Sequence, residues 1–395
     1  SININGTFRY YDSFFYISGT NKGSSDYKTD ITSPLEPRQK FSVGFYDYDT
    51  YLNPHWDAQN MNLSFVLDDG VLNEGRAGID AISVPLIIAA QNPIDDLIFG
   101  HKITKQNSSK KVRKNGKTIA NKNNETVIWA QPIYINASNS SGDNKWDMTS
   151  LIGALGIDIK VNENIVWGFG AEYEKPDYHS DNVDVTADGG NIFVYVMPQI
   201  SKHFESGLFV LGGMNQYLQK REYNKTQYSS NFDSQRISGG INLSFPFEIK
   251  IFDTKTSAQI KPFITYTKTY LTVSSHDEGK GIYALKYEYE EIVFDNLKIG
   301  AQIQKSVSRF ITLDAKIFYS GIYGDKSAKA DISFMNALDI KEKMTGKEID
   351  ENYFGANIGL NFYASEVFTL APSITLTESQ NQSVQQINFN FLYKF

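Results

Sequence analysis

The last nine residues of the chain alternate between apolar and polar side chains. One face carries Ile387, Phe389, Phe391, Tyr393 and Phe395, and the other carries Asn388, Asn390, Leu392 and Lys394. Because successive side chains of a β-strand point to opposite faces, this pattern predicts a strand with one apolar and one mostly polar face. The same alternation recurs upstream in 154–161, 296–303, 311–320 and 357–362. We therefore predict an all-β fold from about Glu125 onward.

The predicted strands are long, and their connections alternate between short and long. The stretches 207–223 and 235–251 run without a clear break, although a typical strand has about five or six residues and a tilted membrane strand needs about 9–11. Short connections are expected near 162–164, 202–206, 253–256, 306–309 and 364–366, and long polar ones near 137–147, 180–188, 221–230, 274–291 and 323–351. This asymmetry is typical of transmembrane antiparallel β-barrels. We expect about 12 strands, an even number that brings both ends of the barrel to the same side.

The first quarter of the chain has a less regular pattern. Strands are expected at 2–16, 40–47 and 61–67, and a short helix within 92–105, where apolar side chains recur at near-helical spacing. The stretch 102–124 is basic and Asn-rich, which predicts a linker. We divide the chain into a β-rich N-terminal region (1–95), a linker that threads the pore (96–124) and an outer-membrane β-barrel (125–395).

Composition narrows the class of protein further. Aromatic residues make up 14% of the chain, which suits a barrel with two aromatic girdles. There is no Cys, which excludes a disulfide framework and thiolate metal sites. The longest apolar stretch, Ile82–Ala90, is too short for a transmembrane helix. The net charge of −7 gives no reason to expect a nucleic-acid partner. No signal peptide is visible at Ser1, so we expect it to have been removed or the chain to derive from a longer precursor.

The chain lacks the usual signatures of an enzyme. None of its five His residues lies in a His-Glu-x-x-His motif, and there is no Gly-x-Ser-x-Gly elbow and no P-loop. Asp181, Asp184 and Asp188 crowd one stretch, which we interpret as a solvated acidic loop rather than a calcium site. We therefore expect no catalytic residues, no cofactor and no metal.

From about Glu125 to Phe395 the chain carries an ordered series of short motifs: Val127–Gln131, Gly153–Asp158, Trp167–Tyr173, Pro262–Tyr266 and Leu297–Gly300. In these motifs and their order the sequence resembles the C-terminal translocator barrel of type V autotransporters. The ending at Phe391, Tyr393 and Phe395 resembles the assembly signal that the barrel-assembly machinery reads, although Asn390 stands where that family usually has Gly.

This resemblance implies a function in protein secretion. It implies a barrel in the bacterial outer membrane that translocates an N-terminal passenger and anchors it at the cell surface, with the linker in its pore. The implied partners are outer-membrane lipid, the barrel-assembly machinery and the chain's own passenger segment, and residues 1–95 would be a passenger stem or a short passenger.

The polar face of the strands supplies the predicted pore lining. Its candidate residues are Asp158, Lys160, Lys298, Gln302, Asp314 and Lys316. We expect these side chains to solvate a threaded chain, and the lysines of 110–117 to pair with carboxylates such as those of Asp158 or Asp314.

Two other interpretations stay open. In the first, residues 1–124 add further strands and the whole chain forms a general or substrate-selective porin with about 16–18 strands; the stretch 1–10 does resemble a first barrel strand. In the second, the protein is a surface adhesin or a soluble β-rich protein. The position of residues 1–95 relative to the barrel separates these readings.

Overall fold

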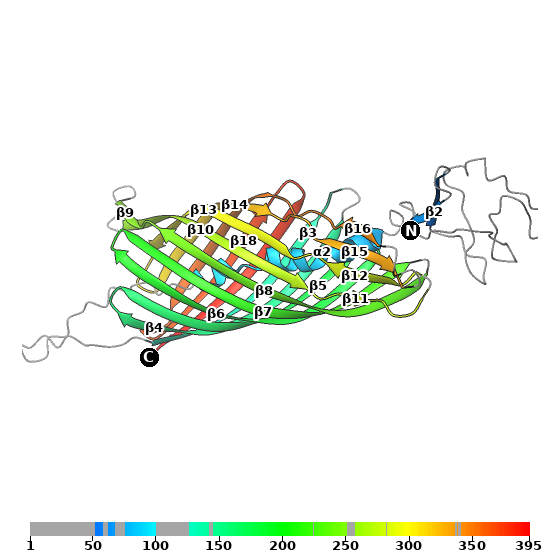
Figure 1. The fold of residues 1–395 in the computed structure, drawn as a ribbon. Helices are drawn as coiled ribbons and strands as arrows, with labels where there is room; N and C mark the ends of the chain where they lie inside the picture. The colour runs from blue at the N-terminus through cyan, green and yellow to red at the C-terminus, as the bar shows by residue number, and fades with distance from the viewer. Residues whose placement is uncertain are drawn as a thin grey trace, which may run out of the picture.

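The computed structural model describes residues 52–57, 62–67, 76–99, 126–141, 145–223, 225–250, 257–281, 283–335, 338 and 341–395. Most of these form one closed antiparallel barrel of 12 strands (Figure 1). The barrel strands are β3 (Thr126–Asn139), β4 (Trp146–Asn162), β5 (Ile165–Ser180), β6 (Val183–Ser201), β7 (Phe204–Tyr223), β8 (Thr226–Ser244), β10 (Ser257–Val273), β13 (Ile292–Ser306), β14 (Ile311–Gly324), β17 (Asn352–Tyr363), β18 (Phe368–Glu378) and β19 (Gln382–Lys394). Pairing of β19 with β3 closes the barrel, which confirms the predicted fold class.

Side chains alternate along the barrel strands as the sequence pattern predicts. On β4, Leu151 and Leu155 are exposed on the outside, whereas Ile152 and Ala154 are buried inside. The outside of the barrel carries a belt of exposed apolar side chains on every barrel strand, including Ile192, Val210, Ile299 and Ile358. A sheet closed on itself leaves no unpaired backbone edge, which a lipid environment requires. A belt of exposed apolar side chains on a closed barrel is typical of transmembrane β-barrels.

The two ends of the barrel differ. The short-turn end carries the tight connections after β4, β6, β13 and β17 and also both termini of the barrel segment, where the Phe395 amide donates to the Thr126 carbonyl at 2.9 Å. It also carries β9 (Phe247–Lys250), which pairs with β10. The opposite, long-loop end carries a four-stranded sheet of β11 (His276–Asp277), β12 (Leu285–Tyr289), β15 (Lys329–Phe334) and β16 (Glu342–Thr345). Both ends are seen in Figure 1.

Two stretches predicted as long loops are strands. β5 continues to Ser180 and β6 begins at Val183, and β7 continues to Tyr223 with β8 beginning at Thr226. At roughly 3.3 Å per residue, strands of this length extend well beyond a hydrocarbon layer of about 30 Å. The outward side chains beyond the apolar belt face water, so they are polar although the backbone is still a strand. This is why composition alone suggested loops there.

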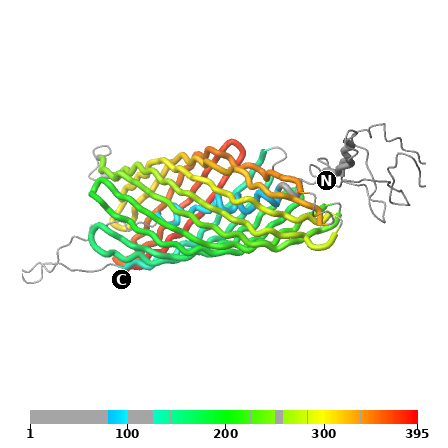
Figure 2. Tube along the Cα trace, in the orientation of Figure 1, coloured from blue at the N-terminus to red at the C-terminus, as the bar shows by residue number. Residues whose placement is uncertain are grey.

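Two helices lie inside the barrel, as the blue and cyan segment of Figures 1 and 2 shows: α2 (Arg76–Gln91) and α3 (Ile94–Phe99). They are separated by Asn92 and Pro93, and a residue that precedes proline disfavours the helical conformation. The segment Asp80–Phe99 is long and apolar enough to be a candidate membrane-crossing helix, but it is mostly buried inside the protein.

The helices partly match the expectations from sequence. α3 falls within the helix expected in 92–105, whereas α2 was not predicted, because a run that is apolar on all sides shows no helical period. An apolar helix of this kind is expected where protein surrounds it. The pore therefore already holds residues 76–95, ahead of the linker expected at 96–124, and residues 100–124 of that linker lie outside the described residues. The expected strand at 61–67 overlaps β2 (Asn62–Leu67), which pairs with β1 (Leu52–Asp57); the strands expected at 2–16 and 40–47 lie outside the described residues.

Candidate pore and its plug

The half of the pore nearer the long-loop end is filled by apolar packing around α2. Ile82, Leu86 and Ile87 are almost completely buried and belong to one apolar cluster with inward side chains of the wall, among them Met148 and Val185. α2 packs against β5, β6, β7 and β10. This half of the described pore is a hydrophobic core rather than a water-filled channel, and we call the segment 76–99 the plug.

An ion pair anchors the plug at the long-loop end. The Asp80 carboxylate of α2 lies 2.8 Å from the Lys347 ammonium group, and both side chains are about 5% exposed. Lys347 follows β16, so this pair joins the plug to the four-stranded sheet. The Tyr289 hydroxyl of β12 also donates to the Ala81 carbonyl at 3.4 Å.

A buried acidic pair holds the bend between the two helices. The Asn92 side-chain amide donates to Glu172 at 3.0 Å and to Glu174 at 2.7 Å. Arg236 lies 3.1 Å from the Glu172 carboxylate, and the amide of Asn215 donates to Glu174 at 2.8 Å. Because a buried carboxylate needs charged or hydrogen-bonding partners, this arrangement fixes where the bend sits in the pore.

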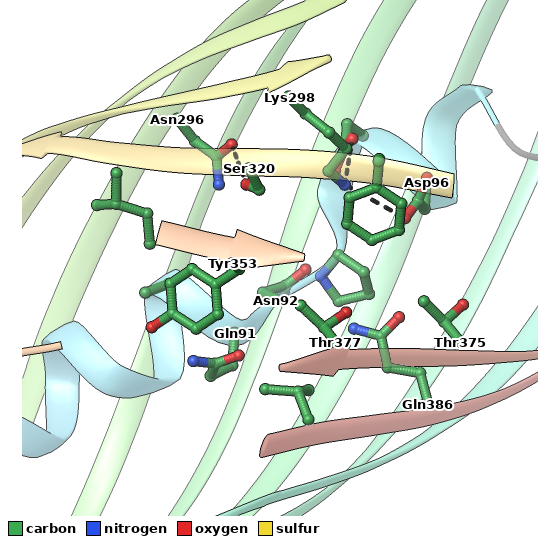
Figure 3. A pocket seen from close by; sticks show the side chains of 16 residues that line it. Gln91, Asn92, Asp96, Asn296, Lys298, Ser320, Tyr353, Thr375, Thr377 and Gln386 are labelled. Carbon is green, nitrogen blue, oxygen red and sulfur yellow. Dashed lines mark hydrogen bonds and ion pairs between the residues drawn. The ribbon is translucent and has the colours of Figure 1, made fainter. Parts of the chain in front are cut away.

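A second set of ion pairs anchors the plug toward the short-turn end. The Lys298 ammonium group lies 2.6 Å from Asp95 and 3.3 Å from Asp96, and Lys316 pairs with Asp96 from the neighbouring strand. Figure 3 shows Lys298 beside Asp96 at the edge of a cavity of about 70 Å³, which Asn92 and Tyr353 also line. A second cavity, of about 120 Å³, also borders Asp96 and lies on its short-turn side.

The structure places the six predicted pore-lining residues as follows. Lys298 and Lys316 pair with the plug, and Gln302 donates to Asp314 at 2.5 Å. Asp158 is buried on the inner face of β4 and accepts a hydrogen bond from the Tyr195 hydroxyl. Lys160 lies two residues further along β4 and is half-buried. The lysines of 110–117 lie outside the described residues, so their expected pairing with Asp158 or Asp314 stays a prediction.

Sequence reasoning missed the residues that hold the plug. They are Asp80, Asn92, Asp95, Asp96, Glu172, Glu174 and Lys347. The only signal available was the short polar interruption Asn92–Asp96 after an apolar run, and two Glu residues on one face of a predicted strand. Nothing local in the sequence connects residues about 200 positions apart.

The three aromatic residues of the predicted assembly signal lie on the outer face of β19. Phe391, Tyr393 and Phe395 are 38%, 45% and 67% exposed, and the last two rings pack edge to face. Their role in assembly stays a prediction. Within the described part of the chain, no group of three or more His, Asp or Glu side chains could hold a metal ion.

Comparison with known proteins places this geometry in context. The family model described as "Autotransporter beta-domain" matches residues 128–373. The structure is similar to the translocator domain of autotransporter NalP from Neisseria meningitidis, with a TM-score of 0.57, 10% identity, and coverage of 70% of this chain and 90% of that one. It is also similar to the transport unit of the autotransporter AIDA-I from Escherichia coli, with a TM-score of 0.53, 12% identity and coverage of 79% and 98%. The β domain of the Bordetella autotransporter BrkA matches with a TM-score of 0.54, 9% identity and coverage of 68% and 99%. No curated protein sequence matches the chain.

Proposed function

Since the chain belongs to the autotransporter β-domain family, we propose that it carries its own N-terminal region through the pore to the cell surface and then anchors it there. The barrel is an outer-membrane translocation barrel for a passenger, and the whole-chain porin of about 16–18 strands is not supported, because the barrel closes with 12 strands from Thr126 to Lys394. We further propose on which side of the membrane the N-terminal region lies, which partners the barrel contacts, and that the barrel carries out no enzymatic step.

The direction of the plug carries the proposal. The chain enters the pore at the long-loop end, where Asp80 contacts Lys347, and runs toward the short-turn end, where Phe99 packs against Phe209 with ring centroids 5.8 Å apart. In transmembrane barrels the long loops are extracellular and the short turns periplasmic. Residues before Arg76 therefore follow from the extracellular side, which is the expected state after a passenger has crossed.

The remaining partners follow from the same physical picture. Outer-membrane lipid contacts the apolar belt, and the barrel-assembly machinery reads the end of β19 through Phe391, Tyr393 and Phe395. The residues of the pore pack, pair charges and donate hydrogen bonds, so we propose that they act mechanically, with no enzymatic step in the barrel.

Protease shaving of intact cells tests the proposal. We expect an added protease to remove residues 1–75 while the barrel stays intact, and we expect deletion of β17–β19 to abolish surface delivery. Full protection of residues 1–75 in intact cells, combined with cleavage after the outer membrane is permeabilised, would show that the region stays in the periplasm and would overturn the proposal.

A further inference from the structure

The cavity of about 120 Å³ at the periplasmic end of the pore has an unusual lining. Seven of its lining residues are Asn or Gln, and several of the others carry hydroxyl groups. Asn361 and Asn390 lie close to the periplasmic ends of β17 and β19. A polypeptide that enters from the periplasm therefore contacts this cavity, which we call the vestibule, before it reaches the level of Asp96.

Three amide groups of the vestibule direct their N–H donors at the barrel wall. Asn242 donates to Thr265 at 2.7 Å, and Asn357 donates to Thr375 at 2.7 Å. Asn388 donates to Ser373 at 3.4 Å. Each pair joins neighbouring strands, and in each the amide NH₂ is engaged by a hydroxyl group. The group that this arrangement leaves for a ligand is the carbonyl oxygen, which is a hydrogen-bond acceptor.

Three side-chain carbonyl oxygens of the vestibule are buried without a partner among the described residues. The side-chain oxygens of Gln131, Asn388 and Asn390 have no hydrogen-bond partner among the described residues, and the three side chains are only 3–7% exposed. An unsatisfied buried acceptor costs roughly 1–3 kcal/mol. A ligand that supplies N–H donors at this place would remove that cost.

The three acceptors gather at the seam between β19 and β3. The pairing runs from Asn388 opposite Ile133 to Phe391 opposite Ala130 and omits the two pairs between, next to Pro132, which has no N–H. Asn388 and Asn390 are two residues apart on one face of β19, so their side chains repeat at about 7 Å. An extended polypeptide repeats its N–H groups along one edge at the same spacing.

We propose that the vestibule binds an extended polypeptide through its backbone N–H groups, with Gln131, Asn388 and Asn390 as the acceptors. This inference rests on the proposed function and names what the pore recognises in a passenger: the peptide backbone, which every passenger has, and not side-chain charge. The three acceptors are neutral, so they neither retain nor repel a segment by its charge. The lining also contains charged residues, among them Asp96 and Lys316, which pair with each other.

Photocrosslinking during secretion tests the contact directly. A photoreactive amino acid replaces Asn390 in the full chain, and in a control it replaces Gln385, which lies on the same strand but faces outward. During a pulse of synthesis, the Asn390 position is expected to crosslink to segments from residues 1–75, and the Gln385 position is not. Absence of crosslinks at Asn390, while residues 1–75 reach the surface, would overturn the inference.

Paired substitutions separate recognition from folding. We expect Asn390→Leu and Gln131→Leu each to slow surface delivery roughly fivefold, the equivalent of one lost hydrogen bond of about 1 kcal/mol. Asn390→Gln keeps a neutral amide acceptor and is expected to stay close to the wild-type rate, as is Gln385→Leu. Equal rates for Asn390→Leu and wild type, with normal barrel assembly, would contradict the inference. Failure of the wild-type chain to deliver residues 1–75 would instead refute the proposed function.

Discussion

The ion pairs between the plug and the barrel wall make the closed state of the pore testable. Asp96 contacts both Lys298 and Lys316, and these three side chains are only about 10–22% exposed. Replacing Asp96 by Ala leaves Lys316 without its carboxylate partner and Lys298 with Asp95 alone. Breaking a buried ion pair from one side costs about 3–5 kcal/mol, because the remaining charge stays buried without a counter-charge.

That cost corresponds to an increase of roughly 100- to 5,000-fold in the population of channels with a displaced plug. Single-channel recording in planar bilayers measures this population as the fraction of time spent in a high-conductance state. We expect rare openings for wild type and frequent openings for Asp96→Ala. The control is Lys343→Ala, which breaks an exposed pair with Glu290 and is worth about 0–1 kcal/mol.

A charge swap tests whether the pairing itself matters. Asp96→Lys is expected to open the channel, and adding Lys316→Asp is expected to restore closure, because the attraction between these two positions is re-formed with opposite signs while Lys298 keeps Asp95. If Asp96→Ala channels remained as closed as wild type, the apolar packing of α2 alone would close the pore, and the assignment of Asp96 as an anchor would be refuted.

Three further outcomes follow from the apolar belt and from the four-stranded sheet at the long-loop end. Ile299→Lys, in the apolar belt, is expected to lower the free energy of unfolding in lipid by about 2–4 kcal/mol. Thr186→Lys, at an exposed polar position near the long-loop end of β6, is expected to have little effect, and equal urea midpoints would show that the belt is misplaced. Burial between Phe232 and Tyr287 lowers the pKa of His276 from 6.5 to about 4. Between these two pH values the unfolded state therefore binds more protons than the folded state, and about 3 kcal/mol of stability is lost as the pH falls from 6.5 to 4. Hydrogen exchange of β11 and β12 would report this loss, and His276→Phe is expected to remove it. Glu278→Gln weakens the buried pair with Arg221, whose nitrogens lie 2.7 and 2.6 Å from the Glu278 oxygens, and is expected to speed hydrogen exchange in β11 and β12 while β17–β19 stay protected; unchanged exchange would contradict the role of this pair.

The barrel was predictable from sequence because lipid and the pore interior impose opposite demands on alternate residues. The period of two alone predicts that Leu155 and Ile299 lie on the outer face and that Asp158 and Lys298 lie on the inner face. The strand segments near the long-loop end were not predictable, because a strand that extends beyond the apolar belt no longer needs an apolar outer face. The polar stretch 184–188 therefore read as a loop although it is part of β6.

The plug was hidden for a different physical reason. α2 is surrounded by protein, so apolar side chains lie on all sides of its stretch Ile82–Ala90 and form no single amphipathic stripe. Its anchors depend on contacts between residues far apart in the chain, such as Asp95 with Lys298 and Asp80 with Lys347. Such pairs follow from the closed barrel and the direction of the helix inside it, neither of which a local pattern contains.

Sidedness of the N-terminal region is the central claim, and the natural absence of Cys makes it directly measurable. Single-Cys variants Ser24→Cys, Asp181→Cys and Glu366→Cys report on the N-terminal region, the long-loop end and the short-turn end. A membrane-impermeant maleimide applied to intact cells is expected to label the first two and to label Glu366→Cys only after permeabilisation. Labelling of Asp181→Cys without labelling of Ser24→Cys, until the outer membrane is opened, would contradict translocation of the N-terminal region by this barrel.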